Sequence, residues 1–258
     1  MLKLEQEPRG LARITMDRPE VHNAFNEVFI AELTALLERV GADPAVRVVV
    51  LAASGKSFSA GADLTWMQAM AGYDEAQNLA DAEGLARLMR TLDRLPKPVI
   101  GRVQGPAFGG GVGLVACCDI AVGAASASFA LSEVKLGLIP AVISPYVVAA
   151  IGERQARRYF LTAERFDAAE AQRIGLLHLV VPDQELDAAV ERLVAALAGN
   201  GPAAVAAAKD LIFAVGRRPT DATVVAETAR RIARIRASAE GKEGIGAFLE
   251  RRKARWQG

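Results

Sequence analysis

The chain has 258 residues, 52% of them hydrophobic and 24% charged, and its 31 basic and 30 acidic side chains leave a formal net charge of +1. This length can bury the core of one globular unit, and the balanced charge gives no general attraction to nucleic acid or to an anionic membrane surface. Residues 1–7 lack the pattern of a signal or transit peptide, and the longest apolar runs, such as 142–151, fall short of the about 20 residues that span a bilayer. We therefore expect a cytoplasmic protein that binds neither nucleic acid nor membrane.

The first half of the chain alternates strand-like and helix-like segments. The predicted strands are residues 11–16, 46–52, 99–103, 119–122 and 128–131. The predicted helices between them are residues 26–40, 74–95 and 109–117. The β-branched run 46–52 is typical of a strand buried on both faces, and the order strand, helix, strand predicts a parallel sheet. The fold class is therefore α/β.

The second half of the chain predicts helices. Beyond Pro182 no β-branched strand follows, and the predicted helices are residues 183–198, 202–215, 221–237 and 241–252. We divide the chain into a core of residues 1–198 and a C-terminal helical region of residues 199–258. The alanine-rich face 203–208 suits close helix packing, either within one chain or between subunits.

The metal-ligating residue types are few. Cys117 and Cys118 are neighbours, which ordinarily cannot pair with each other, and His22 and His178 lie far from them in sequence. We interpret both cysteines as core residues and both histidines as structural, so that no metal site is expected.

Two glycine-rich turns carry the functional prediction. Residues 61–64 (Gly-Ala-Asp-Leu) and Gly109-Gly110-Gly111 each follow a predicted strand, and ligands of α/β proteins bind at the edge where such strands end. Each turn can offer a backbone N–H to one carbonyl oxygen, which stabilises an enolate or oxyanion without a side chain. A tight turn without a ligand is the alternative interpretation of the triple glycine.

A dinucleotide site is another interpretation of the same residues. Residues 111–116 fit the pattern G-x-G-x-x-A, and Glu133 lies at the distance expected for a ribose-binding acid. The predicted helix is short, however, and this interpretation leaves the Gly61 turn unexplained.

Glu133 is the candidate acid and base. Its neighbours in residues 129–140 are mostly apolar, so burial would raise its pKa and suit it to proton transfer near neutral pH. An ion pair with Lys135 at a strand edge is the alternative.

Several ordered motifs together resemble the crotonase (enoyl-CoA hydratase/isomerase) superfamily. They are residues 57–64, 103–111, 118–120, 132–140 and 243–252. The resemblance implies a spiral of ββα units, a C-terminal helical trimerisation domain, and a homotrimer or a hexamer of two trimers. It also implies an acyl-CoA substrate, with no cofactor other than the coenzyme A that the substrate carries.

The resemblance assigns roles to particular residues. The thioester oxygen would accept hydrogen bonds from the N–H groups of Ala62 and Gly110, and the adenine would lie near Ala24 and the carbonyl of Ala60. Phe248 and Lys253 would touch coenzyme A held by a neighbouring subunit. The other predicted substrate-binding residues are Gly61, Asp63, Leu64, Gly109 and Trp66. Trp66 suits either the acyl end of the substrate or the core.

The chain departs from the two-glutamate hydratases of this superfamily. Gly113 stands where the first glutamate falls, and residues 139–147 replace a glycine-rich stretch. This combination, together with residues 60–68, resembles the bacterial methylglutaconyl-CoA hydratases of leucine breakdown and the related isohexenylglutaconyl-CoA hydratases of isoprenoid breakdown. A glutaconyl substrate carries a carboxylate, for which Lys135 and Arg87 are the candidate partners.

Three functions remain open at this point. The first is reversible hydration of an enoyl-CoA in fatty-acid or leucine breakdown, and the second is Δ3,Δ2-enoyl-CoA isomerisation, for which one carboxylate suffices. A non-catalytic acyl-CoA-binding or RNA-binding scaffold is the third.

Overall fold

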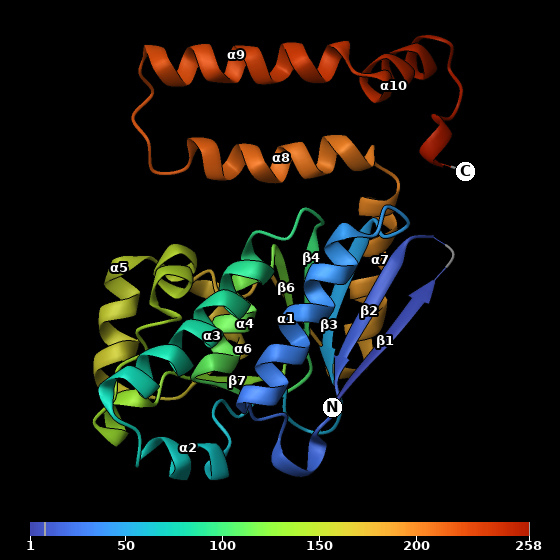
Figure 1. Ribbon diagram of the computed structural model, residues 1–258. Coiled ribbons are helices and arrows are strands. Elements are labelled where there is room, and N and C mark those ends of the chain that lie inside the picture. Colours follow the sequence, from blue (N-terminus) through green and yellow to red (C-terminus); the bar gives the residue numbers. More distant parts are fainter. Residues whose placement is uncertain (8, 258) are drawn as a thin grey trace.

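A six-stranded sheet forms the centre of the molecule, as the computed structural model, which describes residues 1–7 and 9–257, shows in Figure 1. In spatial order its strands are β1 (Leu2–Glu7), β2 (Leu11–Met16), β3 (Val48–Ala53), β4 (Val99–Val103), β6 (Ile120–Ala124) and β9 (Leu179–Val181). From β2 to β9 all neighbours are parallel, as the alternation of strands and helices predicts, and only β1 pairs antiparallel. A second sheet contains β5 (Ala107–Phe108), β7 (Ser128–Ala130) and β8 (Phe166–Asp167).

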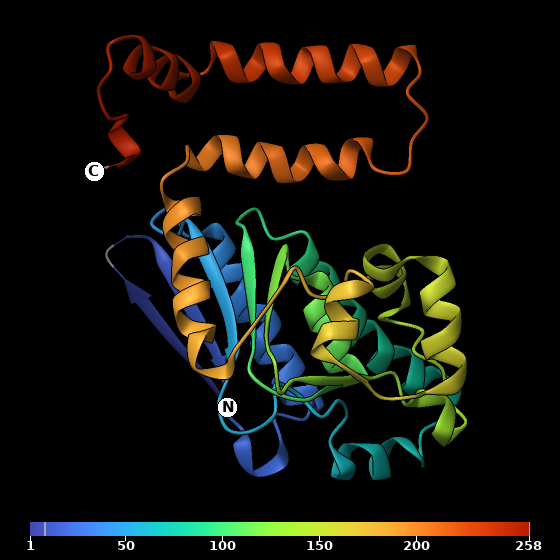
Figure 2. The same cartoon turned by 180° about the vertical axis from the view of Figure 1, so that it is seen from behind.

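Helices cover both faces of the large sheet. On one face lie α1 (Glu27–Ala42), α3 (Glu75–Asp93) and α4 (Gly110–Cys117), with α5 (Ser144–Thr162) beyond α4. On the other face lies α7 (Leu186–Ala198), which Figure 2 shows in front of the strands. Val49 and Leu51 of β3 belong to the core on the α1 side, whereas Val48 and Val50 belong to the core on the α7 side. The β-branched run is thus buried on both faces, as predicted.

Side-chain caps set the starts of the two long helices. The Asn26 side chain accepts from the Phe29 N–H at the start of α1, and Asp74 and Gln77 form a reciprocal capping box at the start of α3. These starts lie within one residue of the predicted ones.

Several elements were not predicted. β1 is mostly exposed, so it carries no buried apolar pattern, and β9 has only three residues. α5 was missed because Pro145 lies in its first turn and Gly152 interrupts it with φ of 75° and ψ of 157°. The short helices α2 (Leu64–Met70) and α6 (Ala168–Arg173) complete the core.

The C-terminal arm consists of α8 (Pro202–Val215), α9 (Ala222–Ala237), α10 (Ala239–Leu249) and the residues that follow to 257. It stands apart from the sheets in both views (Figures 1 and 2). The last helix begins two residues earlier and ends three residues earlier than predicted, because Ser238 caps its N-terminus. The Glu240 carboxylate of α10 accepts from the N–H groups of Ala203 and Ala204, at 3.0 and 2.8 Å, which ties α10 to the start of α8.

Polar contacts of Lys209 and Arg47 join this arm to the core. Lys209 of α8 donates to Asp119 at 2.7 Å, and the Arg47 guanidinium donates to the carbonyl oxygens of Asn200 and Trp256 at 2.7 and 2.9 Å. No helix in residues 1–7 and 9–257 combines the length and the apolar character needed to cross a membrane.

Candidate active site

The two glycine turns lie against each other. Gly61 has φ of 87°, and a Cβ added to it would lie 3.0 Å from the carbonyl oxygen of Phe108 and 3.8 Å from the backbone N of Gly110. Any side chain at Gly61 would therefore push the turns apart, besides being strained by the positive φ. The structure brings together the two turns that the sequence singles out.

The Ala62 N–H faces away from the neighbouring strand segment. The Gly61 carbonyl accepts from Phe25 N–H at 2.7 Å, and the Asp63 N–H donates to the Phe25 carbonyl at 2.7 Å. Because successive residues of an extended segment point their N–H groups to opposite sides, the Ala62 N–H points away from Phe25. It donates to no acceptor in the described part of the chain.

The Gly110 N–H is the first of α4. Gly109 has φ of 48°, its N–H donates to the Ala130 carbonyl at 2.9 Å, and its carbonyl accepts from Val112 and Gly113. The first N–H groups of a helix have no partner within that helix, and the positive end of the helix dipole lies beside them. The N–H groups of Gly110 and Ala62 thus both lack an acceptor among the described residues, and they are the two donors that the resemblance assigns to the thioester oxygen.

Glu133 lies beside the second turn. It begins the 3₁₀ helix η2 (Glu133–Leu136), and a Cβ added to Gly109 would lie 3.1 Å from its Oε1. Its Oε2 is buried and accepts no hydrogen bond from the described residues. Burial raises the pKa of Glu133, and its own backbone N–H offsets this only in part. A buried carboxylate without a partner is costly for folding and typical of a proton-transfer site.

The predicted alternatives for these residues are wrong. Glu133 starts a 3₁₀ helix rather than edging a strand, and no ion pair of the described residues joins it to Lys135. A dinucleotide site does not fit either, because Gly111 lies inside α4, where an added Cβ would meet the Ser59 carbonyl at 2.7 Å. The first glycine of a dinucleotide motif belongs to the tight turn before the helix, and Gly111 does not lie there.

Asp63 is a positioning residue. Its Oδ1 accepts from the Thr65 N–H, which caps α2, and its Oδ2 accepts from Arg18 at 3.0 Å. The Arg18 guanidinium also donates to the Ala24 carbonyl at 2.6 Å. Burial raises the pKa of Asp63, but the hydrogen bonds from Thr65 and Arg18 outweigh it and hold this pKa below its usual value. Arg18 thus joins the Gly61 turn to the expected adenine site, and its role was not predicted because its ion-pair partner Asp63 lies 45 positions along the chain.

The other predicted contact residues differ in their surroundings. Ala24 is buried, and the Ala60 carbonyl accepts no hydrogen bond within the described residues. Leu64 is 77% exposed at the start of α2. Trp66 is buried and its indole N–H donates to Asp81 at 3.1 Å, so the structure makes it a core residue that joins α2 to α3.

Arg87 and Lys135 differ as partners for a substrate carboxylate. Arg87 donates to Glu38 of α1 at 2.8 Å, so its guanidinium faces α1 and is already paired. Lys135 is exposed on η2, two residues after Glu133. The structure therefore favours Lys135.

Phe248 and Lys253 do not reach the two turns of their own chain. Phe248 is 82% exposed on α10, and Lys253 is exposed beyond it. Both views place α10 on the opposite side of the core from α2, which begins directly after the Gly61 turn (Figures 1 and 2).

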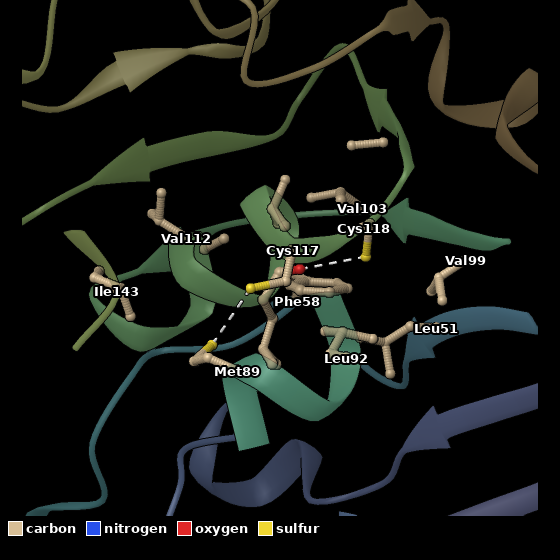
Figure 3. Packing of buried hydrophobic residues seen from close by; sticks show 14 of the residues in the cluster. Leu51, Phe58, Met89, Leu92, Val99, Val103, Val112, Cys117, Cys118 and Ile143 are labelled. Carbon is tan, nitrogen blue, oxygen red and sulfur yellow. Dashed lines mark hydrogen bonds between the residues drawn. The ribbon is translucent and has the colours of Figure 1, made fainter. Parts of the chain in front are cut away.

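Both cysteines are buried in the core, as predicted, and each histidine contacts a distant segment of the chain. The Cys117 and Met89 sulfur atoms lie 3.9 Å apart in the core, and Cys118 Sγ lies 3.3 Å from the Leu114 carbonyl (Figure 3). His178 Nδ1 accepts from the Ala121 N–H, and His22 Nδ1 lies 3.0 Å from the Ser57 hydroxyl. Within residues 1–7 and 9–257, no group of three His, Cys, Asp or Glu side chains is arranged to hold a metal ion.

The Ile143 side chain packs tightly against Gly113 of α4. A Cβ added to Gly113 would lie 2.3 Å from Ile143 Cγ2, so the position of the absent glutamate has no room for a side chain. Ile143 belongs to residues 139–147, which stand in place of a glycine-rich stretch, and only the folded chain brings it against Gly113.

The chain belongs to the enoyl-CoA hydratase/isomerase family, whose model matches residues 6–258. A crotonyl-CoA hydratase of Syntrophomonas wolfei is 34% identical over 253 residues, which are 97% of this chain and 95% of that protein. The crystal structure of an enoyl-CoA hydratase from Shewanella pealeana is 49% identical with a TM-score of 0.96, covering 99% of this chain and 95% of that one. One from Mycobacterium smegmatis is 33% identical with a TM-score of 0.94, covering 100% and 99%.

These similarities define the fold and the class of protein. The α/β crotonase fold is confirmed, and the chain is an enzyme of a family whose members include lyases named as hydratases. Membership in this family favours the enzymatic interpretations over a non-catalytic scaffold.

Proposed function

We propose that the protein adds water reversibly across the double bond of an α,β-unsaturated acyl-CoA. The observation that carries this proposal is the half-buried Glu133, whose Oε2 has no partner among the described residues, beside two touching turns whose Ala62 and Gly110 N–H groups are also unpaired there. A base next to an oxyanion site is what addition to a conjugated thioester requires. The hydratases among its relatives support the same reaction.

The reaction needs one proton acceptor and one oxyanion site. The Glu133 carboxylate takes a proton from water, the resulting hydroxide oxygen bonds to Cβ, and the electron pair of the double bond moves onto the thioester oxygen as an enolate. The N–H groups of Ala62 and Gly110 stabilise that oxygen. Protonated Glu133 then returns the proton to Cα on the same face, so the addition is syn. No metal and no cofactor apart from the coenzyme A of the substrate takes part.

The substrate that we propose is 3-methylglutaconyl-CoA or a related glutaconyl thioester, in leucine or isoprenoid breakdown. The α4 side of the site has no second carboxylate, because Gly113 stands there. A glutaconyl substrate brings its own polar end group, which can help to hold water, and Lys135 is the exposed cation nearest Glu133 in sequence. Lys135 is our candidate partner for that carboxylate.

A spectrophotometric assay tests this proposal. Purified protein is offered crotonyl-CoA, 3-methylglutaconyl-CoA and a 3-enoyl-CoA, and the absorbance of the conjugated thioester is followed. We expect this absorbance to fall with 3-methylglutaconyl-CoA and to fall much more slowly with crotonyl-CoA. The Glu133→Gln variant is the control for contaminating activity.

Isomerisation is the second candidate, because a single carboxylate can move a proton between two carbons without water. A gain of absorbance from the 3-enoyl-CoA, with no loss from the other two thioesters, would identify an isomerase. No reaction with any of the three would refute the proposed chemistry.

We also propose that the protein assembles as a homotrimer or as a hexamer of two trimers through the C-terminal arm. The arm leaves large apolar side chains exposed, namely Ile212, Val225, Ile232, Ile245, Phe248 and Leu249. Phe248 and Lys253 would then reach coenzyme A bound by a neighbouring subunit. A cytoplasmic location stays a prediction.

Oligomerisation gives a direct prediction for Phe248. We expect light scattering to give the mass of three or six chains of 27.3 kDa. The Phe248→Ala variant should raise KM for the acyl-CoA and change kcat little, because it removes a contact to coenzyme A and not to the reacting atoms. A monomeric mass for the wild-type protein would contradict the assembly, and the exposed Lys242→Ala serves as the matched control.

A further inference from the structure

Gly113 and Ile143 fit each other in size. A Cβ built on Gly113 would lie 2.3 Å from Cγ2 and 2.9 Å from Cβ of Ile143, and 3.2 Å from Cε of Met89. Both distances to Ile143 are shorter than real carbon contacts. The Ile143 side chain therefore occupies the volume that any side chain at position 113 would need.

The Ile143 side chain has little freedom to move away. It is 3% exposed, and its carbonyl accepts from Tyr146 and Val147 at the start of α5, which fixes its backbone. Its β-branched side chain has few accessible rotamers, and a rotation about χ1 does not move its Cβ. Figure 3 shows it in the buried cluster that also contains Val112 and Met89.

The pair lies one helical turn from the reacting groups. Gly113 donates its N–H to the Gly109 carbonyl, and Gly109 is the residue that lies against Glu133. α5, which Ile143 directly precedes as the N-cap residue, packs against both α4 and η2. Ile143 thus lies where α5 meets α4, α5 also contacts the η2 helix that carries Glu133, and no residue of α4 is acidic.

We propose that Ile143 is a specificity-determining residue. By filling the space beside Gly113 it keeps the α4 side of the site apolar, so the enzyme favours substrates whose own polar end group helps to hold the attacking water over simple alkenyl thioesters. This inference rests on the proposed hydratase function. It predicts a steric coupling between positions 113 and 143. It also predicts that changing both residues shifts the substrate preference from 3-methylglutaconyl-CoA toward crotonyl-CoA.

A stability measurement tests the coupling without any assay of activity. Gly113→Ala is made in the wild-type, Ile143→Val and Ile143→Gly backgrounds. Valine keeps the β-branch and is the matched control, whereas glycine removes both the Cγ2 at 2.3 Å and the Cβ at 2.9 Å. We expect Gly113→Ala to lower Tm by about 4–8 °C in the first two backgrounds, as overpacking does, and by less than about 2 °C in the third. Equal losses in all three would overturn the coupling.

A kinetic measurement tests the preference. The measured quantity is the ratio of kcat/KM for crotonyl-CoA to kcat/KM for 3-methylglutaconyl-CoA. We expect this ratio to be at least about tenfold higher in the double variant Gly113→Glu with Ile143→Gly than in Ile143→Gly alone, because the double variant supplies a second carboxylate. Gly113→Gln with Ile143→Gly has the same size without the charge and should give a smaller increase. If the charged double variant folds poorly, Ile143→Ala, which only vacates space, should shift the ratio in the same direction.

The failures can be told apart. An unchanged ratio in folded variants, or equal turnover of both thioesters by the wild-type protein, would overturn the specificity role and leave the hydratase function intact. Hydration of neither thioester by the wild-type protein would refute the proposed function and with it the specificity role, while the Tm series would still report the packing.

Discussion

Replacing Glu133 with glutamine is expected to lower kcat for hydration by about 10²–10⁴-fold, because the amide cannot take the proton from water. Binding of the unsaturated thioester should change little, since the N–H groups of Ala62 and Gly110 remain in place. We also expect the absorbance of the bound thioester to move to longer wavelength, because these donors polarise its carbonyl. Steady-state kinetics and a difference spectrum of the variant check both statements. Full activity in Glu133→Gln would contradict the mechanism, and binding without a spectral shift would contradict the oxyanion site.

The pH dependence of Glu133 has a definite sign. Burial raises its pKa, and the base must be ionised, so hydration by the wild-type protein should rise with pH through a value above that of an ordinary glutamate. A raised pKa in the folded state also means that stability is lost as pH rises through it. Glu133→Gln should therefore have a higher Tm than the wild-type protein at neutral pH, and this difference should shrink on acidification below the ordinary pKa of glutamate.

Removing the charge of Lys209 is the prediction with the largest effect on stability. The Lys209 side chain is 9% exposed and donates to Asp119 Oδ2 at 2.7 Å and to the Lys97 carbonyl at 3.3 Å. Asp119 also accepts from the Val99 N–H of β4. Burial already raises the pKa of Asp119, and Lys209 opposes that rise. Loss of one partner of a buried pair leaves the other charge uncompensated.

We therefore expect Lys209→Met to lower the free energy of unfolding by about 3–5 kcal/mol. The double variant Lys209→Met with Asp119→Asn should be more stable than Lys209→Met alone, because it removes the unpaired charge. Lys242→Met, at an exposed position of α10, is the matched control and should change little. Denaturant unfolding at one protein concentration measures all three. A loss below about 1 kcal/mol in Lys209→Met would mean that the pair does not anchor α8.

The sequence alone predicts the part of the fold that depends on local patterns. The run that forms β3 is β-branched because both of its faces are buried, and Asn26 and Asp74 mark helix starts because their side chains cap them. The C-terminal helices follow from composition and from Pro202. α5 escaped prediction because Gly152 breaks its periodicity, and β1 because its exposed face carries no apolar signal.

The candidate site divides in the same way. The turns at Gly61 and Gly109 and the apolar surroundings of Glu133 can be identified from neighbouring residues. Contacts that join distant segments cannot, and the ion pair of Arg18 with Asp63 spans 45 positions. The packing of Ile143 on Gly113 is of this second kind, since only the folded chain brings α5 against α4. The sequence shows that glycine stands at position 113 in place of a glutamate. It does not show that the Ile143 side chain fills the space beside this glycine.

Arg47 binds the carbonyl of Asn200, where the chain leaves the core, and that of Trp256, where it returns. The Gln257 side chain also donates to the Gly199 carbonyl at 3.3 Å. The C-terminal arm is thus fastened at both of its ends to one spot, so it cannot swing about residues 199–201 as a flexible tether would. Its direction is encoded within a single chain, so in the assembly proposed above the angle at which another subunit meets the arm would already be determined when that chain folds.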